Sequence, residues 1–386
     1  MVATEKGTLR LLKRFVLLLL ASTPLFAAVL PEERADVLYH RYDGGGLTVD
    51  GPSVLVRKNV ADKVSISGNY YVDKISSASI DVVSQASPNG YSEQRTEKSL
   101  GATYLYDRTL MSANVIDSDE PDYTARTYSF DFSQDFFGDL TTFSMGYTRG
   151  TDTIKKNGTP DFKEDATHQE YRVGLTQIVT RNLLVGISEE IITDQGYLNS
   201  PYRQVRYLDP SGSNYLFQPE VYPRSRTSNT TALRARYHLP NHRSAVYGNY
   251  RHYSDGWDIR GNTFELGYTY TLPQGWLFDV HYRYYKQSQA DFYSDLFPYQ
   301  DAQHYLARDR QLSDFHSSTF GAGVSYEMPF RNNKWVDKAS VNLYWDRMQV
   351  DYENFTDIRV QGDTPGNEPL YSFDADIVRF FLTVWY

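Results

Sequence analysis

The sequence predicts an all-β fold, an antiparallel up-and-down β-barrel that spans a membrane. Apolar and polar residues alternate along segments of about 10 to 13 residues, the length at which a tilted strand crosses a bilayer. Short turns and long polar loops alternate between these segments. The chain has 33 tyrosines among its 386 residues, yet its mean hydropathy is −0.54. This combination requires many half-buried positions, which strands supply at every second residue.

Residues 262–286 give the clearest strand pattern. Phe264, Leu266 and Tyr268 alternate with small or polar residues up to the turn Pro273-Gln274-Gly275, after which apolar residues again occupy every second position. The segment therefore predicts a hairpin with one apolar and one polar face. The same alternation predicts strands near residues 64–73, 141–147, 170–176, 233–239 and 376–386.

The connections are short and long in turn. Short turns are predicted near residues 107–108, 135–138, 180–182, 240–243, 273–275 and 329–334, and long loops near residues 76–94, 154–166, 196–227, 289–314 and 352–373. Outer-membrane barrels have short periplasmic turns and long external loops. Counting back from Tyr386 gives about fourteen strands that begin near Asp62, and sixteen if residues 37–59 add a hairpin.

Charged residues recur at mid-strand on one face of the predicted strands. In the core of a β-sandwich, the rival fold, such charges would be very costly, whereas a wet lumen solvates them. They are therefore candidates for lining a pore, where charged rings set selectivity, but they could also pair across the lumen and plug it. The candidates are Glu170, Arg172, Arg234, Arg236, Glu265, Asp279, His281, Arg283, Asp346 and Arg379.

The N-terminal residues have the form of a secretory signal peptide. Four basic residues precede the apolar run FVLLLLASTPLFAAV, and cleavage is expected after Ala27 or Ala28. The alternative is an uncleaved anchor. This predicts three parts: a signal peptide over 1–28, a segment 29–61 that is periplasmic, luminal or an extra hairpin, and the barrel over 62–386. Gly44-Gly45-Gly46 is a flexible turn and not a phosphate loop.

The C-terminal strand has an apolar face that ends on an aromatic residue. A closed barrel has no free edge, so this face is expected to contact lipid, with Tyr386 in the periplasmic aromatic girdle. Such a strand also resembles the signal that the barrel-assembly machinery recognises in its clients. The residues of this predicted signal are Phe380, Leu382, Val384 and Tyr386.

Several stretches resemble a family of uncharacterised bacterial proteins. PEERADVLYHRYDGGG, VDGPSVLVRKN, NYYVDKISSASIDVVSQAS and YSEQRTE are similar to the family catalogued as domain of unknown function number thirty-five-seventy. The resemblance covers nearly all of the chain after the signal peptide and implies an outer-membrane barrel. Genes of this family often lie near those for a small lipoprotein and a periplasmic flavin-attaching enzyme, which implies redox or export partners.

The most distinctive motif of this resemblance lies where a strand enters the first long loop. Its polar residues could supply oxygen ligands or narrow the pore, or they could form an ordered loop that caps the lumen. These residues are Asp73, Ser76, Ser77, Ser79 and Asp81.

Other motifs point only weakly to chemistry. Ser313, His316, Ser317 and Ser318 lack a nucleophile elbow and a third catalytic group, so no enzyme activity is expected. The acidic residues Asp117, Asp119, Glu120 and Asp122 could hold calcium loosely but fit a solvated loop better. The aromatic and arginine-rich loop 196–227 suits recognition, or packing on itself. No metal site and no cofactor are predicted.

The predicted function follows from the barrel. We expect an outer-membrane channel of porin-like character, for transport of small polar solutes, in a Gram-negative bacterium. The alternative is an occluded structural barrel that binds a periplasmic lipoprotein or a redox or export partner, and a barrel enzyme comes third. The net charge of −9 argues against nucleic acid as a partner. The absence of cysteine excludes disulfides and thiolate metal sites.

Overall fold

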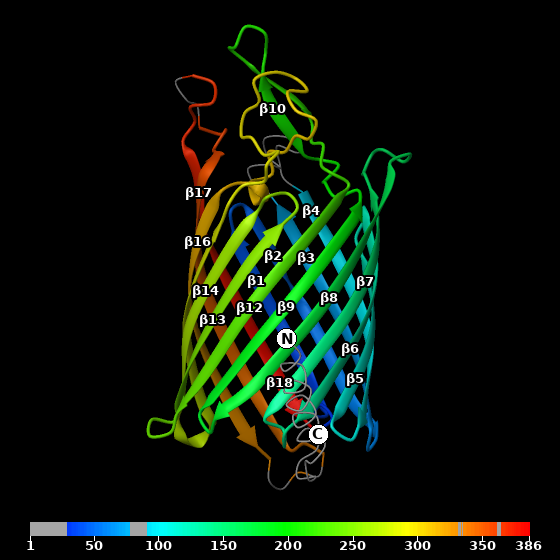
Figure 1. Ribbon diagram of the computed structural model, residues 1–386, viewed down its shortest axis with the longest axis vertical. Helices are drawn as coiled ribbons and strands as arrows, with labels where there is room; N and C mark the ends of the chain where they lie inside the picture. Colours follow the sequence, from blue (N-terminus) through cyan, green and yellow to red (C-terminus); the bar gives the residue numbers. More distant parts are fainter. Residues whose placement is uncertain (1–28, 78–90, 331–332, 334, 361–363) are drawn as a thin grey trace, which may run out of the picture.

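The protein is a closed barrel of antiparallel strands, seen in a computed structural model that describes residues 29–77, 91–330, 333, 335–360 and 364–386 (Figure 1). Sixteen strands form the wall, in the order β1-β18-β17-β16-β15-β14-β13-β12-β9-β8-β7-β6-β5-β4-β3-β2. Neighbours in the sequence are therefore neighbours in the wall, except where β12 follows β9 and where β18 closes onto β1. No helix in these residues is long and apolar enough to cross a membrane.

The wall strands are long, as a tilted transmembrane strand requires. Their bounds are β1 Arg34–Gly44, β2 Leu47–Ala61, β3 Val64–Ser77, β4 Tyr91–Tyr106, β5 Thr109–Asp119, β6 Tyr123–Phe136, β7 Thr141–Lys155, β8 Lys163–Thr180, β9 Leu183–Gly196, β12 Ser225–Leu239, β13 Ser244–Asp255, β14 Arg260–Thr271, β15 Trp276–Gln287, β16 Phe315–Pro329, β17 Lys338–Thr356 and β18 Leu370–Trp385. A separate hairpin, β10 Gln204–Leu208 with β11 Tyr215–Pro219, lies in the loop after β9. Two short 3-10 turns are η2 Pro273–Gly275 and η3 Arg310–Leu312.

The wall has sixteen strands, which was the alternative prediction, and the first estimate of about fourteen is two strands short. The missing pair is the hairpin β1–β2, which takes its place in the wall. Gly45 and Gly46 form its two-residue turn with φ of +59° and +76°, a conformation that glycine adopts without strain. The pair Gly51-Pro52 interrupts the apolar pattern of β2, which is why its alternation is hard to recognise in the sequence.

The barrel closes between its first and last strands. β1 pairs with β18 from Arg34 opposite Trp385 to Gly44 opposite Ala375, without a register shift. Beyond β18, the Tyr386 hydroxyl donates a hydrogen bond of 3.0 Å to the carbonyl of Arg57 on β2. The ammonium of Lys58 lies 5.0 Å from the centre of the same ring. The last residue thus ties β18 to β2 across β1, and no sheet edge is left open.

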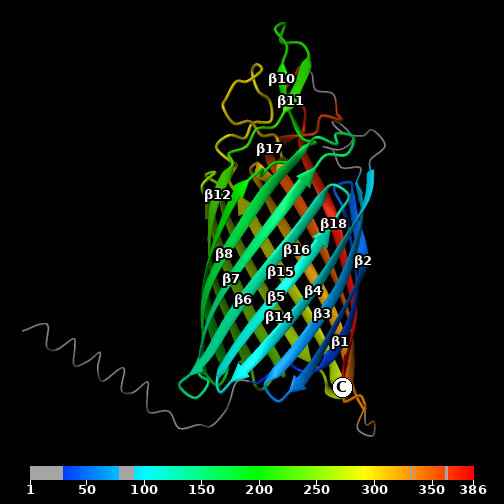
Figure 2. The same ribbon diagram turned by 90° about the vertical axis from the view of Figure 1, so that its right-hand side faces the viewer.

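The two ends of the barrel differ. The turns near residues 62–63, 107–108, 137–140, 181–182, 240–243 and 272–275 lie at the end that also holds the C-terminus, while the long loops and the β10–β11 hairpin rise from the other end (Figure 2). The predicted alternation of short and long connections is therefore observed. The strands extend further into the long loops than predicted, since β8 begins at Lys163 and β17 ends at Thr356.

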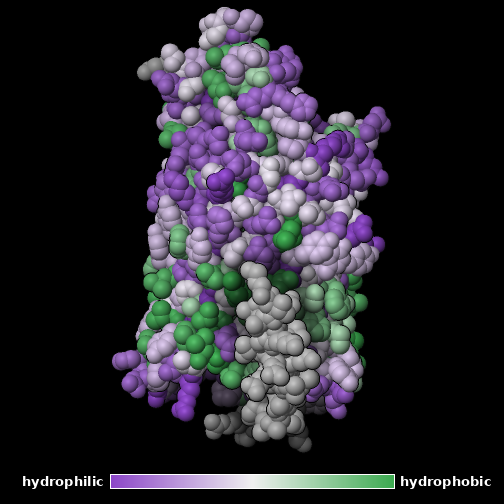
Figure 3. Space-filling view, viewed as in Figure 1, coloured by the Kyte–Doolittle hydropathy of each residue, from purple (hydrophilic) through white to green (hydrophobic). Residues whose placement is uncertain are grey.

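The outer face of the wall has an apolar zone and a polar zone. Hydrophobic residues gather on the half nearer the short turns (Figure 3). Nearer the loops, outward-facing strand residues form ion pairs, such as Arg126 with Asp117 at 2.6 Å and Arg41 with Asp43 at 2.8 Å. Ion pairs of this kind suit water and not hydrocarbon. The loop half of the barrel therefore has the surface of a region that stands clear of the bilayer.

Candidate functional site

The candidate site is the inner wall of the barrel. On β14 and β15, Phe264, Leu266 and Val280 are exposed large hydrophobic residues and so mark the outer face. Their neighbours Glu265 and Asp279 have the opposite parity and face the lumen. Followed through the strand register, the same parity places all ten predicted pore-lining residues on the inner face: Glu170, Arg172, Arg234, Arg236, Glu265, Asp279, His281, Arg283, Asp346 and Arg379.

The charges of the inner wall pair along it. Arg172 lies 2.9 Å from Asp131 and 3.1 Å from Glu170. On the far side of the barrel, Asp346 binds Arg379 at 2.5 Å and lies 3.3 Å from His281. In the part of the chain that the structure describes, no ion pair between wall strands joins strands more than two places apart in the barrel. Pairing across the lumen, one of the two predicted arrangements, is therefore not what these residues do.

Glycines on the inner face let these side chains lie flat against the wall. A Cβ on Gly321 would lie 2.1 Å from Cε1 of His281 and 2.2 Å from Oδ1 of Asp346. These two residues thus occupy the space that a larger residue on β16 would need. Gly146 and Gly174 border a hollow of about 490 Å³ on the inner face of β5 to β12, which is also lined by Arg172 and Arg234. The small residues keep volume in the lumen free.

Three exposed, inward-facing arginines have no acidic partner among the described residues. Arg234, Arg236 and Arg283 are exposed, and no carboxylate of the described residues lies within ion-pair distance of them. Arg236 instead lies over the ring of Tyr247, with 5.7 Å between the guanidinium carbon and the ring centre. An exposed residue on the inner face is one that water reaches from the lumen.

A second cavity, of about 490 Å³, lies at the loop end of the lumen. Three of its carboxylates, on Glu93, Glu120 and Asp122, place oxygens within 4.8 Å of one another, and the Tyr202 hydroxyl donates to Asp122 over 2.6 Å. Burial raises the pKa of Glu120, which lies in the turn after β5. Oxygen ligands suit hard cations, so these residues are the ones that could hold a metal ion.

The predicted loose calcium group is only partly assembled. Glu120 and Asp122 turn into the cavity and meet Glu93 from β4. Asp117 instead faces outward and pairs with Arg126, and Asp119 has the same outward parity. The period of two along β5 separates these acids, because it sends Asp117 and Asp119 to the opposite face.

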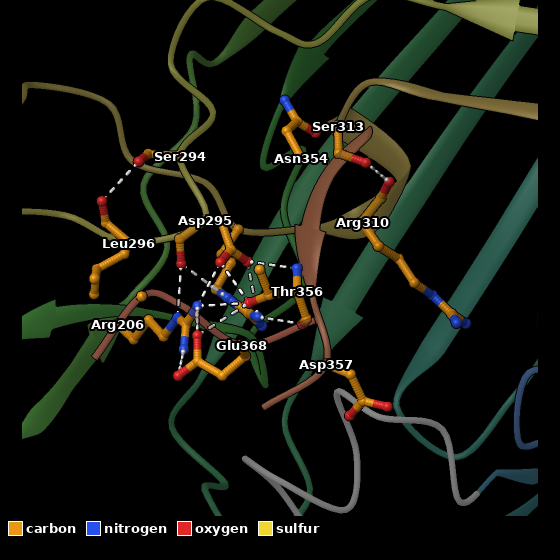
Figure 4. A network of polar contacts seen from close by, with 12 residues as sticks. Arg206, Ser294, Asp295, Leu296, Arg310, Ser313, Asn354, Thr356, Asp357 and Glu368 are labelled. Atoms are coloured by element: carbon orange, nitrogen blue, oxygen red, sulfur yellow. Dashed lines mark hydrogen bonds and ion pairs between the residues drawn. The ribbon is translucent and has the colours of Figure 1, made fainter. Parts of the chain in front are cut away.

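Three loops meet beside the mouth and are joined by a buried polar network that we call the loop lock (Figure 4). Its members are Arg206, Asp295, Arg308, Thr356 and Glu368. Arg206 contacts Asp295, lies 3.1 Å from Glu368 and donates to the Thr356 hydroxyl over 2.7 Å. Arg308 lies 2.9 Å from Asp295 and donates to the Thr356 carbonyl over 3.1 Å. The relative exposures of the two arginines are 0% and 1%, so the network is almost dry.

A hydrophobic cluster next to the loop lock includes Tyr222, Trp257, Phe292 and Leu312. Here the buried carboxylate of Glu220 accepts hydrogen bonds of 2.7 Å from the Tyr222 hydroxyl and from the backbone N–H of Arg308. Burial raises the pKa of Glu220 to about 7. The loop 196–227 thus packs on neighbouring loops as well as on itself.

The residues of the predicted family motif belong mainly to the wall. Asp73 is buried on the inner face of β3, 2.9 Å from His40 and 3.6 Å from Arg95. Ser76 and Ser77 end the same strand. Ser79 and Asp81 lie outside the described residues, as does the predicted signal peptide over 1–28.

Two further groups of predicted residues can be placed. The register puts Phe380, Leu382 and Val384 of the predicted assembly signal on the outer face of β18. The serines and histidine near residue 313 do not converge. Ser313 is buried and donates to the Arg310 carbonyl over 2.7 Å, while His316 faces outward, 3.8 Å from Asp351.

Comparison with known proteins supports the family and the fold. A family described as "Protein of unknown function (DUF3570)" matches residues 78–166 and 159–363. No curated protein matches the chain. A bacterial polysaccharide outer membrane secretin is 8% identical with a TM-score of 0.50, over 92% of this chain and 99% of that one.

Two further solved structures are less similar. The siderophore receptor PirA from Pseudomonas aeruginosa is 9% identical with a TM-score of 0.43, over 92% of this chain and 63% of that one. A Pseudomonas aeruginosa FadL homologue is 9% identical with a TM-score of 0.40, over 92% and 90%. At such identities the likeness to the secretin shows the fold of an outer-membrane barrel and no activity.

Proposed function

The chain belongs to the family of proteins of unknown function DUF3570, and we propose that it is a water-filled channel for small polar solutes in the outer membrane of a Gram-negative bacterium. Sixteen strands are enough for an aqueous lumen, since barrel width grows with strand number. The apolar half of the outer wall suits a bilayer, and the polar half suits the medium on the side of the long loops.

One observation carries this proposal: arginines on the inner wall are exposed and have no acidic partner. Arg234 and Arg283 are the clearest cases. An unpaired guanidinium in a dry, filled lumen would cost several kcal/mol. In a hydrated lumen it costs little. The pairing of the other charges along the wall agrees with a hydrated interior, and β1 and β2 belong to the wall and do not fill it. The loop before β16 narrows only the loop end, where Gln287 donates to the carbonyls of Gln311 and Ser313.

The second candidate is an occluded structural barrel that binds a periplasmic lipoprotein or a redox or export partner. The loop lock favours it, because it holds three loops together beside the mouth. The exposed arginines favour the channel. We therefore rank the channel first and treat the loop lock as a fixed part of its entrance.

Liposome swelling tests the proposal. The protein is refolded into liposomes, and its folding is checked by heat-modifiable gel mobility. A channel predicts swelling in small neutral sugars at a rate that falls as the sugar becomes larger. Folded protein that gives no more swelling than empty liposomes would overturn the channel and favour the occluded barrel.

A further inference from the structure

We propose that the inner wall from β12 to β15 is a binding site for small oxyanions, solutes that carry a carboxylate or phosphate group. The site consists of Arg234, Arg236, Arg251 and Arg283, which we call the arginine patch. This inference rests on the proposed channel and names the class of solute that its lumen favours. Arginine suits this role because its planar guanidinium binds carboxylate and phosphate through two parallel hydrogen bonds.

The strand register brings these arginines onto one area of the inner wall. Arg234 on β12 is opposite Asn249, which is opposite Glu265, which is opposite Arg283. Arg251 is two residues along β13 from Asn249, and so lies diagonal to Arg234, roughly 7 to 8 Å away between Cα atoms. Since neighbouring strands are about 4.8 Å apart, the Cα atoms of Arg234 and Arg283 lie about 15 Å from one another. Long side chains can converge over such a span.

The charge of the arginine patch is only partly balanced. Asn249 and Glu265 lie between Arg234 and Arg283 across the strands, and Glu265 accepts a hydrogen bond of 2.9 Å from Asn249. Asp279 accepts one of 2.7 Å from Thr269. Arg251 lies 3.8 Å from Glu190, the only ion pair that any of the four arginines makes with the described residues. Most guanidinium donors of the patch are therefore free for a solute.

All four arginines are exposed, which distinguishes them from the other arginines of the barrel interior near mid-strand. Arg172 is half-buried and held by Asp131 and Glu170. Arg379 is likewise half-buried and is held by Asp346. The wall thus contains half-buried arginines that are held in local networks, and exposed arginines on β12, β13 and β15, of which Arg251 alone makes an ion pair with the described residues.

The opposite wall carries its charges nearer the loop end, where Arg95 pairs with Asp73 and Glu97. Seven strands lie between β13 and β3 in either direction round the barrel, so these two strands face one another. Nearer the short turns, the inner face of β3 to β5 presents Ser67, Asn69, Ser99, Gly101 and Asn114. Small neutral polar groups leave room for a solute and donate or accept hydrogen bonds without competing for the arginines. An oxyanion in the lumen is therefore drawn to one side.

The test uses the full-length refolded barrel in planar bilayers. The variant is Arg234→Gln/Arg251→Gln/Arg283→Gln, and the matched control is Arg149→Gln, which removes one charge from the outer face of β7. In a potassium chloride gradient, the wild type and the control are expected to prefer chloride, and the triple variant to shift its reversal potential towards potassium. Inorganic phosphate is expected to reduce the chloride current, with an affinity about tenfold or more lower in the triple variant.

Each outcome decides the inference. Equal ion preference and equal phosphate inhibition in the wild type and the triple variant would overturn the arginine patch but leave the channel intact. A folded wild type without any current would instead contradict the channel. In that case calorimetric titration of the detergent-solubilised proteins with inorganic phosphate tests whether the arginine patch binds oxyanions. Phosphate binding by the wild type that is lost in the triple variant supports the site. No binding by the wild type, or equal binding by both proteins, overturns it. Heat-modifiable mobility shows that each variant is folded.

Discussion

Replacing Arg206 by alanine should open the loops beside the mouth and leave the barrel intact. Arg206 is fully buried and contacts Asp295, Glu368 and Thr356. Removing one partner of a buried ion pair typically costs about 3–5 kcal/mol, because the remaining charge stays buried without compensation. Asp295 keeps Arg308 at 2.9 Å. We therefore expect the lower end of that range, about 3 kcal/mol.

A loss of about 3 kcal/mol corresponds to a roughly hundredfold larger open fraction of the loops. Hydrogen exchange followed by mass spectrometry measures it, because local opening controls the exchange of loop amides. Peptides from residues 204–219 and 288–314 should exchange roughly a hundredfold faster in Arg206→Ala. Peptides from the wall strands should be unchanged and serve as an internal reference.

A matched control comes from the same group of loops. Arg359 is exposed and binds Asp357 at 2.7 Å, so Arg359→Ala should cost no more than about 1 kcal/mol. The pair Arg206→Ala/Glu368→Gln should exchange more slowly than Arg206→Ala alone, since it removes the uncompensated carboxylate. If Arg206→Ala exchanged no faster than Arg359→Ala, the loop lock would not hold the loops together, and the reasoning would be refuted.

Three further predictions concern pH, packing and assembly. Because burial raises the pKa of Glu220 to about 7, the protonated form is favoured in the folded loops. The stability of the folded loops should therefore be greatest below about pH 4.5 and should fall by at most about 1.4 kcal/mol per pH unit up to pH 7. Hydrogen exchange at pH 5 and 8 should show this loss. Glu220→Gln should abolish the loss. Gly321→Ala should destabilise the barrel by about 1–3 kcal/mol through overpacking. Gly248→Ala should change its stability little, because the added Cβ would meet its nearest atom at 3.8 Å. The urea midpoints of the two variants in detergent compare them, and equal midpoints would contradict the packing argument. Tyr386→Ala should lower the fraction of protein assembled in the outer membrane, measured by heat-modifiable mobility of membrane fractions; normal assembly would argue against the predicted signal.

The fold and the orientation of wall residues could be predicted because they depend on a period of two. Once Phe264 and Leu266 are assigned to lipid, Glu265 between them must face the lumen. The same rule places Arg234, Arg283 and Asp346. The hairpin β1–β2 was harder to predict because polar and apolar residues share both of its faces, with Leu38 and His40 inward and Tyr39 and Arg41 outward.

The loop lock could not be predicted, because no local pattern connects its members. Arg206, in the β10–β11 hairpin, is 89 positions from Asp295 and 162 positions from Glu368, which both lie in irregular loops. Tertiary packing alone brings them together. The same holds for Glu93, which meets Glu120 and Asp122 from a different strand. Which arginines lack a partner is also a matter of register between strands, and the sequence of one strand does not contain it.

Single-channel conductance of the purified, refolded wild-type protein in a planar bilayer tests the central claim most directly. The exposed, unpaired arginines of the inner wall predict steady openings and a continuous water path from the loop end to the short-turn end. A barrel that is shown to be folded by its heat-modifiable mobility but carries no current would contradict the claim that the lumen is open.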